Sequence, residues 1–345
     1  MKKNLLAFSL ITSAIFCCDY SSAQRTADLG FSSGITEFFG DLGNDKGIIP
    51  WSSTNMGCAV TIRNFLNNPM NSGAMYTPFS LEARLSWHRI GYDETAPIGD
   101  MKGSELRNYF RGINFRNDIL GASAHLTYTY YPDKYRSLYK QKFCIFGFAG
   151  IGAFYGRPKA DLFRGKSNIG NRYFIWNDGT LRDADERTGN GNIIERDGTY
   201  ETDLLGWRTE GQGDDFENGR RPMYSPVNVA FPLGFGVRYG LSKLMTLSAE
   251  FAYYYFLTDY LDDVSDRYAT NSEINRTFPD DPVKQQLAVY ISDPSGRGTD
   301  GTAQMPPSSR RGNPRLKDSF TYISMEIAYK INLKKKGIYG AVARK

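Results

Sequence analysis

Residues 227–251 read VNVAFPLGFGVRYGLSKLMTLSAEF, with an apolar side chain at almost every second position. From 227 to 239 the large apolar residues stand at odd positions, and the even positions hold mainly small residues. A period of two is typical of a β-strand, whose successive side chains point to opposite faces. After the turn GLSK the pattern resumes from Met245 to Phe251. The segment therefore predicts two strands joined as a hairpin.

The alternation alone would also suit a water-soluble sandwich, but strand length and the second face favour a membrane barrel. A strand that crosses a bilayer needs about 9 to 11 residues. The first strand reaches that length, and its glycine, alanine and asparagine face suits a narrow lumen. Pro232 cannot donate to the sheet ladder, so we expect a bulge or a local break there.

The same alternation recurs along the chain, except in 142–156, which is apolar on both faces, so that its register stays open. Eight strands are predicted in all, with long and short connections in turn. This is the organisation of outer-membrane barrels, which have short periplasmic turns and long external loops. Closure also removes the unpaired strand edges that lipid cannot satisfy. We therefore predict an all-β fold, an eight-stranded antiparallel transmembrane β-barrel over 24–331. The strands are expected at about 26–36, 55–64, 78–90, 119–131, 142–156, in the hairpin and at 319–331, with long loops at about 37–54, 91–118, 157–224 and 258–318.

Composition agrees with this class. The 345 residues include 23 Tyr, 22 Phe and 35 Gly, and aromatic girdles are a feature of outer-membrane barrels. No apolar run of 18 residues follows the N-terminal segment, which excludes a helical membrane protein. The net charge of +5 is mild and basic residues are interleaved with acidic ones, so we expect no nucleic-acid partner.

Both ends of the chain carry signals of their own. Residues 1–23 show a basic start, an apolar stretch and a small-residue cleavage site, so we predict a signal peptide cleaved after Ala23. A lipoprotein anchored at Cys17 or Cys18 is the alternative. Export together with barrel strands implies a Gram-negative outer membrane. The basic tail 332–345 is expected in the periplasm, either solvated near anionic headgroups or acting as a docking peptide through Lys334, Lys335 and Lys336.

Several titratable residues fall on the predicted inner face of the barrel. An eight-stranded barrel is just wide enough for its side chains to fill it, and buried charges need partners. We therefore predict an internal ion-pair network that plugs and stiffens the barrel, with a proton or solute pathway as the alternative. The residues are Glu82, Arg84, His88, His125, Arg238, Glu250 and Glu326.

Metal and cofactor chemistry finds little support. His88 and His125 could bind a metal as a pair, but no carboxylate or cysteine stands at a recognisable ligand spacing. We predict no metal site and no cofactor.

The loop stretch 177–192 resembles a calcium loop only in part. Asp183, Asp185 and Gly189 fit, but Arg187 occupies a ligand position and no glutamate closes the loop. We expect a solvated polar loop.

Enzymatic motifs are missing from the sequence. It contains no Gly-x-Ser-x-Gly, no P-loop and no HExxH, and two inward histidines leave little for a Ser–His triad. We therefore expect no enzyme and no small-molecule substrate. Cys58 and Cys144 lie in strands that are not neighbours, so we expect two unpaired thiols that act as small apolar residues.

Six segments of the sequence are distinctive. They are FRGINFRNDI (110–119), FGFAGIGAFYGRPKA (146–160), TEGQG (209–213), VNVAFPLGFGVRYGLSK (227–243), FLTDYLDDVSDRY (256–268) and RRGNPRLKDSFTYISMEIAYKI (310–331). Together they resemble the Bacteroidota outer-membrane β-barrel family typified by PorG, a component of the type IX secretion system. The resemblance implies an eight-stranded barrel and association with a periplasmic ring of the PorK lipoprotein and PorN type (GldK and GldN in gliding relatives). It also implies a role in protein export and, in some species, gliding motility.

Within this resemblance, Asp259, Tyr260, Asp262 and Asp263 follow the seventh strand. Aspartates that cap a strand end and accept local backbone hydrogen bonds are one interpretation; a cation site or a partner contact is the other. For the whole chain we expect a non-enzymatic barrel that organises the secretion apparatus. The alternatives are a stand-alone barrel whose long loops bind an extracellular ligand or surface, and a small pore.

Overall fold

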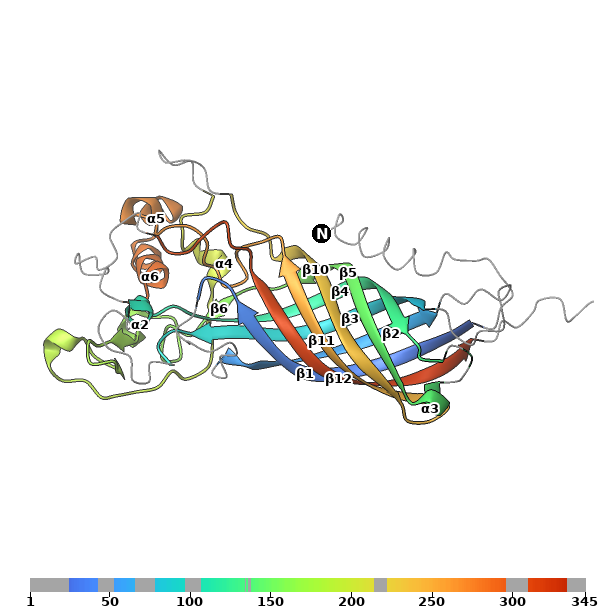
Figure 1. The fold of residues 1–345 in the computed structure, drawn as a ribbon. Coiled ribbons are helices and arrows are strands. Elements are labelled where there is room, and N and C mark those ends of the chain that lie inside the picture. The colour runs from blue at the N-terminus through green and yellow to red at the C-terminus, as the bar shows by residue number, and fades with distance from the viewer. Residues whose placement is uncertain are drawn as a thin grey trace, which may run out of the picture.

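The computed structural model describes residues 25–42, 53–65, 78–96, 107–133, 135, 138–213, 222–295 and 310–333. Eight long antiparallel strands form a closed barrel, because each pairs with the next and β1 pairs with β12 (Figure 1). This confirms the predicted fold. The strands are β1 (Arg25–Phe39), β2 (Asn55–Phe65), β3 (Phe79–Asp93), β4 (Asn114–Tyr130), β5 (Phe143–Tyr155), β10 (Val227–Gly240), β11 (Met245–Phe256) and β12 (Ser319–Leu333).

Pro232 interrupts only one side of its strand. The pairing of β10 with β5 skips Phe231 and Pro232 and then resumes in the same register, while the pairing with β11 continues through Pro232 opposite Tyr254. An inserted residue would shift the register beyond the break. The structure therefore has the local break and not the bulge, as expected for a residue without an amide hydrogen.

Side chains alternate between the lumen and the outer wall along every strand. In β5, whose faces the sequence left undecided, Phe146 and Phe148 point inward, whereas Ile145 and Ile151 are exposed on the wall. Aromatic residues stand near both ends of the wall, as in the girdles of membrane barrels. They are Phe79, Tyr128, Tyr130, Phe143 and Tyr329 at one end, and Phe39, Tyr155, Phe231 and Tyr255 at the other.

The cysteines among the described residues, Cys58 and Cys144, lie on opposite sides of the barrel wall. Cys144 is buried on the inner face of β5, together with Phe146 and Phe148. Cys58 lies on the outer face of β2 with Met56 and Val60. Both thiols are free. Because they face opposite ways on strands that are not neighbours, no disulfide can join them.

The two ends of the barrel differ in size (Figure 1). One, the short-turn end, carries the tight β10–β11 turn, the short helix α3 (Leu138–Gln141) and the described termini of β1 and β12. The other carries the four long connections. We call the described residues there the cap, namely 40–42, 53–54, 94–96, 107–113, 157–213, 222–226, 257–295 and 310–318.

Short elements give the cap its shape. β6 pairs with the cap-side end of β4, where Lys159 lies opposite Arg116. β9 pairs in turn with β6, so the barrel wall continues into the cap. No helix among the residues described is long and apolar enough to cross a membrane. The cap elements are α2 (Arg107–Arg111), β6 (Lys159–Ala160), η3 (Ile169–Asn171), β7 (Phe174–Ile175), β8 (Leu181–Arg182), η4 (Glu186–Thr188), β9 (Thr202–Asp203), α4 (Leu204–Trp207), α5 (Asn271–Thr277) and α6 (Pro282–Ser292).

Local sequence explains the two longest cap helices. Thr270 and Glu273 form a capping box at the start of α5, in which each side chain accepts from the other residue's backbone amide. The Asp281 side chain accepts from the Lys284 amide, and Pro282 occupies the first turn of α6.

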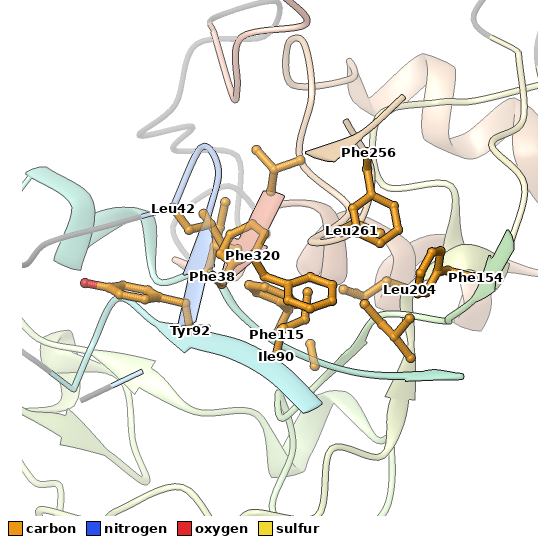
Figure 2. Packing of buried hydrophobic residues seen from close by; sticks show 14 of the residues in the cluster. Phe38, Leu42, Ile90, Tyr92, Phe115, Phe154, Leu204, Phe256, Leu261 and Phe320 are labelled. Atoms are coloured by element: carbon orange, nitrogen blue, oxygen red, sulfur yellow. The ribbon is translucent and has the colours of Figure 1, made fainter. Parts of the chain in front are cut away.

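A hydrophobic layer joins the cap to the barrel. Figure 2 shows Phe320 and Phe38, from the strand ends next to the cap, packed with Phe115, while Leu261 and Leu204 come from the cap. The rings of Phe38 and Phe115 meet edge to face with centroids 4.9 Å apart. Burial of this layer makes the cap part of the folded body of the protein.

Candidate functional sites in the lumen and the cap

Arg63 of β2 is the centre of the charge network in the lumen. Its guanidinium nitrogens lie 2.5 Å from Glu82, 3.0 Å from Glu326 and 3.9 Å from Asp28. All four residues are buried. One cation therefore links strands β1, β2, β3 and β12 across the lumen.

A second pair lies farther along the lumen. Both terminal nitrogens of Arg84 bind the carboxylate of Glu250, at 2.6 and 2.9 Å, which is the planar two-bond geometry preferred by arginine. The Arg238 guanidinium stands 3.9 Å from Glu82 and 4.4 Å from the Phe146 ring centroid. A network of this kind is costly to break, because removing one partner leaves the others buried and unpaired.

All seven residues expected on the inner face are buried in the lumen, but the two histidines do not join the ion pairs. His88 is enclosed by the rings of Tyr254, Phe320 and Tyr322, with centroids 4.7 to 5.1 Å away. His125 lies 2.9 Å from the Ser123 hydroxyl and stacks on Phe148. Both imidazoles therefore pack against aromatic rings and lie apart from the ion pairs.

The register also separates the histidines. His125 is opposite Glu82, and His88 lies six residues farther along β3 than Glu82. At 3.3 Å per residue the two imidazoles are about 20 Å apart along the strand direction. They cannot bind one metal ion as a pair.

Sequence reasoning missed Arg63 and Asp28 as members of the network. The signal for Arg63 was available, because Gly57, Ala59 and Thr61 form the small-residue face of β2 and Arg63 continues it. A lone arginine at the end of a strand resembles an interfacial residue. The strand register places it directly opposite Glu82 and Asp28, and closure of the barrel through the β1–β12 pair adds Glu326.

Aromatic rings fill the rest of the lumen toward the cap. Phe154, Tyr254, Phe256 and Phe320 are completely or almost completely buried there, and neighbouring rings contact one another. Tyr254 and Phe320 stack with centroids 4.6 Å apart. Charged pairs and rings together occupy the lumen, as expected for a barrel of eight strands.

In the cap, segments from distant parts of the chain meet at Arg311. Its guanidinium lies 3.3 Å from Glu210 and 3.6 Å from Asp263, and it donates to the backbone oxygen of Asp263. Asp263 also accepts from Thr209 and, at 2.6 Å, from the Tyr224 hydroxyl. Burial raises the pKa of Asp263 to about 6 although Arg311 opposes the shift.

Glu210 and Tyr260 complete this arrangement. Glu210 accepts from the backbone amides of Ser265 and Asp266, at 2.9 and 3.2 Å, and the Tyr260 hydroxyl lies 3.4 Å from its carboxylate. The Tyr260 ring also stacks on Tyr224 with centroids 4.6 Å apart. The segments TEGQG, TDYLDDVS and RRGNP are thus brought together.

The segment FRG joins the same region through Arg111. Arg111 pairs with the buried Glu94 and donates to the backbone oxygens of Arg311, at 2.8 Å, and Asp41, at 3.2 Å. Four of the segments that carry the family resemblance therefore contact one another in the cap, although they are far apart in sequence.

A group of four aspartates lies beside this network. Burial raises the pKa of Asp259 to about 7, and burial together with the charge of Asp318 raises that of Asp262 well above its usual value. The pKa of Asp318 is also well above its usual value, through burial and the charges of Asp259 and Asp41, and burial raises that of Asp41. The four carboxylates therefore influence one another.

Other acidic residues of the cap hold local backbone groups. Asp161, Asp197 and Glu201 have carboxylate oxygens within 4.8 Å of one another. Most of these oxygens accept from loop amides, among them Gly198 to Asp161 and Gly165 to Asp197.

In the stretch 177–192, both aspartates singled out as a partial calcium loop are engaged locally. Asp183 accepts from the amide and the side chain of Asn192, at 2.8 and 3.0 Å, and Asp185 pairs with Arg187 at 2.6 Å. These hydrogen bonds order the loop and use the oxygens that a metal ion would need.

The predicted signal peptide and the lysines Lys334, Lys335 and Lys336 lie outside the described residues. Neither a known family model nor a curated protein matches the chain. Similar solved structures include Ail of Yersinia pestis (6% identity, 90% of this chain and 100% of that chain, TM-score 0.31). OprG of Pseudomonas aeruginosa (9%, 90% and 97%, 0.32) and a major outer membrane protein of Thermus thermophilus (8%, 90% and 100%, 0.37) are also similar.

These similarities are low, and the assignment rests on the barrel itself. The strands close without a free edge, the outer wall is apolar between aromatic ends, and the charged side chains are paired inside. Such a surface requires lipid around it. The protein is an outer-membrane β-barrel protein.

Proposed function

We propose that the protein is a non-enzymatic outer-membrane component of the type IX protein secretion machinery and, in gliding species, of the motility machinery. It anchors or organises a periplasmic ring formed by a lipoprotein of the PorK type and a partner of the PorN type. Outer-membrane lipids surround the barrel, and the ring contacts its short-turn end, where the basic tail begins.

The observation that carries the proposal is the convergence of the resembling segments in the cap. The contacts of Arg111 and Arg311 bring FRG, TEGQG, TDYLDDVS and RRGNP together, and their polar side chains serve as partners to one another. A resemblance that reflects common structure is expected to cluster in this way. The filled lumen also favours an anchoring role over transport through the barrel.

A pull-down from the native envelope tests the proposal. The tagged protein is extracted in mild detergent and its partners are identified by mass spectrometry. We expect the ring lipoprotein and its partner in near-stoichiometric amounts. The triple variant K334Q/K335Q/K336Q should recover less of both if the tail is the docking peptide.

The matched control places the same change at the other end of the molecule. K159Q/K166Q/K284Q removes three exposed lysines of the cap, and it should leave ring recovery unchanged. Recovery of the barrel alone, from a lysate in which the ring is present, contradicts the proposal. Loss of an extracellular ligand in the cap variant, with secretion intact, would instead support the stand-alone barrel.

A further inference from the structure

A groove hollows the outer wall of the barrel over four neighbouring strands. It extends from β1 across β12 and β11 to β10 and measures about 590 Å³. The small outward residues Ser33 and Ala249 lie there among larger apolar ones, Phe251, Ile323 and Met325. Because its lining is apolar and faces outward, the groove opens toward the acyl chains of the membrane.

The groove lies halfway along the lipid-facing wall. On β12 it is lined by Ile323 and Met325. These residues stand midway between Ser319, whose partners on both neighbouring strands are girdle residues, and Tyr329 of the other girdle. The interval from 319 to 329 spans about 33 Å of strand, which a tilt of about 40° reduces to about 25 Å of membrane thickness. The groove is therefore near the middle of the bilayer, where the acyl chains of each leaflet end.

A basic side chain stands above the groove, where β12 meets the cap. The pairing of β11 with β12 continues past the strand ends, because Phe256 donates to the backbone oxygen of Asp318 and the Asp318 amide donates to that of Thr258. Lys317 thus continues the outward face of β12 beside Leu257, which is 55% exposed. The wall is still apolar at the height at which this cation appears.

Arg315 adds a second cation at the same edge. It is exposed in a turn that the Leu316 amide closes by donating to the Asn313 oxygen, and Leu316 itself is 56% exposed. The Lys317 ammonium donates to the backbone oxygen of Pro314 at 3.0 Å, which keeps it close to this turn. Neither Arg315 nor Lys317 forms an ion pair with a residue that the structure describes, so both are available to an external anion.

The distance between the two cations and the groove fits one leaflet. From Lys317 to Ile323 the chain advances six residues, which is about 20 Å of strand and about 15 Å of depth at the same tilt. Half of a hydrocarbon core of about 30 Å is also about 15 Å. A phosphate held at Lys317 therefore places the ends of its acyl chains at the level of the groove.

A lipid with a phosphate at its head and acyl chains below it matches both features. We propose that Arg315 and Lys317 bind a phosphate of a lipid A molecule, one acyl chain of which ends in the groove. Long connections of outer-membrane barrels face outward, so the cap end lies in the leaflet that lipid A occupies. Arginine and lysine bind phosphate, and their long side chains reach from an apolar surface to the headgroup level. The site continues the lipid-facing wall and does not depend on the proposed secretion role.

Lipid binding by the purified protein tests the site. The protein is washed free of native lipid in an uncharged detergent and mixed with bisphosphorylated lipid A, and native mass spectrometry counts the lipids on each chain. We expect one tightly bound lipid A per chain. Lipid A from which a phosphatase has removed both phosphates should bind about tenfold more weakly or less, since each basic residue near a membrane surface contributes to the attraction. Phosphatidylglycerol that binds as tightly as lipid A would overturn the assignment of the ligand.

One pair of variants tests the phosphate contact. R315Q/K317Q should weaken lipid A binding by about tenfold or more, because it removes both charges. R164Q/K166Q is the matched control, since it removes two exposed basic residues at the same spacing elsewhere in the cap, and it should bind as the wild type does. Equal affinities for R315Q/K317Q and the wild type, or equal losses in the two double variants, would contradict the proposal.

A second pair of variants tests the groove without changing any charge. A249F fills the groove and should also weaken lipid A binding. A124F places the same ring on the exposed outer face of β4, on the opposite side of the closed sheet, and should have no effect. Heat-dependent migration in gels shows that each variant is folded. A folded A249F that binds lipid A as the wild type does would exclude the groove, and a folded wild type that retains no lipid A would overturn the whole site.

Discussion

At the scale of single residues, the stability of the barrel depends on buried arginines. Their carboxylate partners are buried as well, so water cannot take the place of the arginine. Arg63 contacts three carboxylates, all of them buried. The substitution R63M should destabilise the barrel by about 3–5 kcal/mol, because it leaves buried anions without a cation. The measurement is the urea midpoint of the purified protein refolded in detergent.

The matched control for Arg63 is Arg89, whose pair with Asp118 is about one third exposed on both sides. R89M should change the free energy of unfolding by about 1 kcal/mol or less. The double variant R63M/E82Q should recover part of the stability, because it removes one of the unpaired anions. Equal losses in R63M and R89M would show that the lumen network is not what holds the strands.

Asp259 makes cap stability depend on pH. Its pKa is raised to about 7 by burial, so the folded state binds the proton more tightly than the unfolded state. The stabilisation is present at low pH and is lost as pH rises through about 7. The groups that face Asp259 are Asp41, Glu210 and Lys317, with Asp262 and Asp318 beside it.

We therefore expect the unfolding temperature of the cap to rise as pH falls from 8 to 5. Trp176 and Trp207 lie in the cap, so their fluorescence in a W51F/W87F background reports on it. D259N should flatten this dependence, because it removes the group that titrates. A cap that loses stability between pH 8 and pH 6 would contradict this assignment of Asp259.

At the scale of elements, the strands were predictable and the cap was not. Alternation pointed to the strands, because a wall between lipid and lumen imposes a period of two. The exception is β5, whose segment is apolar on both faces and was expected as a strand without a register. β3 and β4 run farther into the cap than 78–90 and 119–131, because they pair with each other as far as Asp93 opposite Asn114. β6 supplies a further partner to β4 there. Helices α5 and α6 were expected only as loop, since short capped helices leave little periodicity to detect.

The contacts between distant segments of the cap could not be predicted from the sequence either. Thr209 meets Asp263 from 54 residues away, and Arg111 meets Arg311 from 200 residues away. Loop composition sets no register between such segments; only the barrel, which fixes where each loop starts and ends, brings them together. The aspartates of TDYLDDVS were predictable as candidates, but their neighbours Asp41 and Asp318 were not.

Tyr290 of α6 ties this helix to the third long connection. Its buried hydroxyl lies 3.0 Å from the backbone oxygen of Leu162 and 3.3 Å from that of Tyr173. Y290F leaves these carbonyls without their donor, at a cost of about 1–3 kcal/mol. We expect trypsin to cut faster within 157–213 in Y290F. Y255F, on the outer wall, should digest as the wild type does; equal rates for Y290F and wild type would argue that α6 does not hold this connection.

At the scale of the whole molecule, the same barrel faces three environments. Its outer wall is apolar for lipid, its lumen is filled with ion pairs and rings, and its cap is an ordered polar body. Sequence alternation predicted the first two, since inner and outer residues are read from one strand. The alternation could not predict whether an open path runs through the lumen, because that depends on which side chains from opposite strands contact one another.

The filled lumen predicts that the protein does not conduct ions. Reconstituted in planar bilayers, the wild type should give no stepwise current, because Arg63, Arg84 and Arg238 with their carboxylates occupy the barrel and an eight-stranded lumen leaves no room beside them. A large porin added afterwards confirms that the bilayer reports channels, and protease protection confirms that the barrel is inserted. Steps of constant size that vanish when the barrel is heat-unfolded before addition would show an open path. The anchoring role would then give way to transport, since a pore and a plug cannot both describe this lumen.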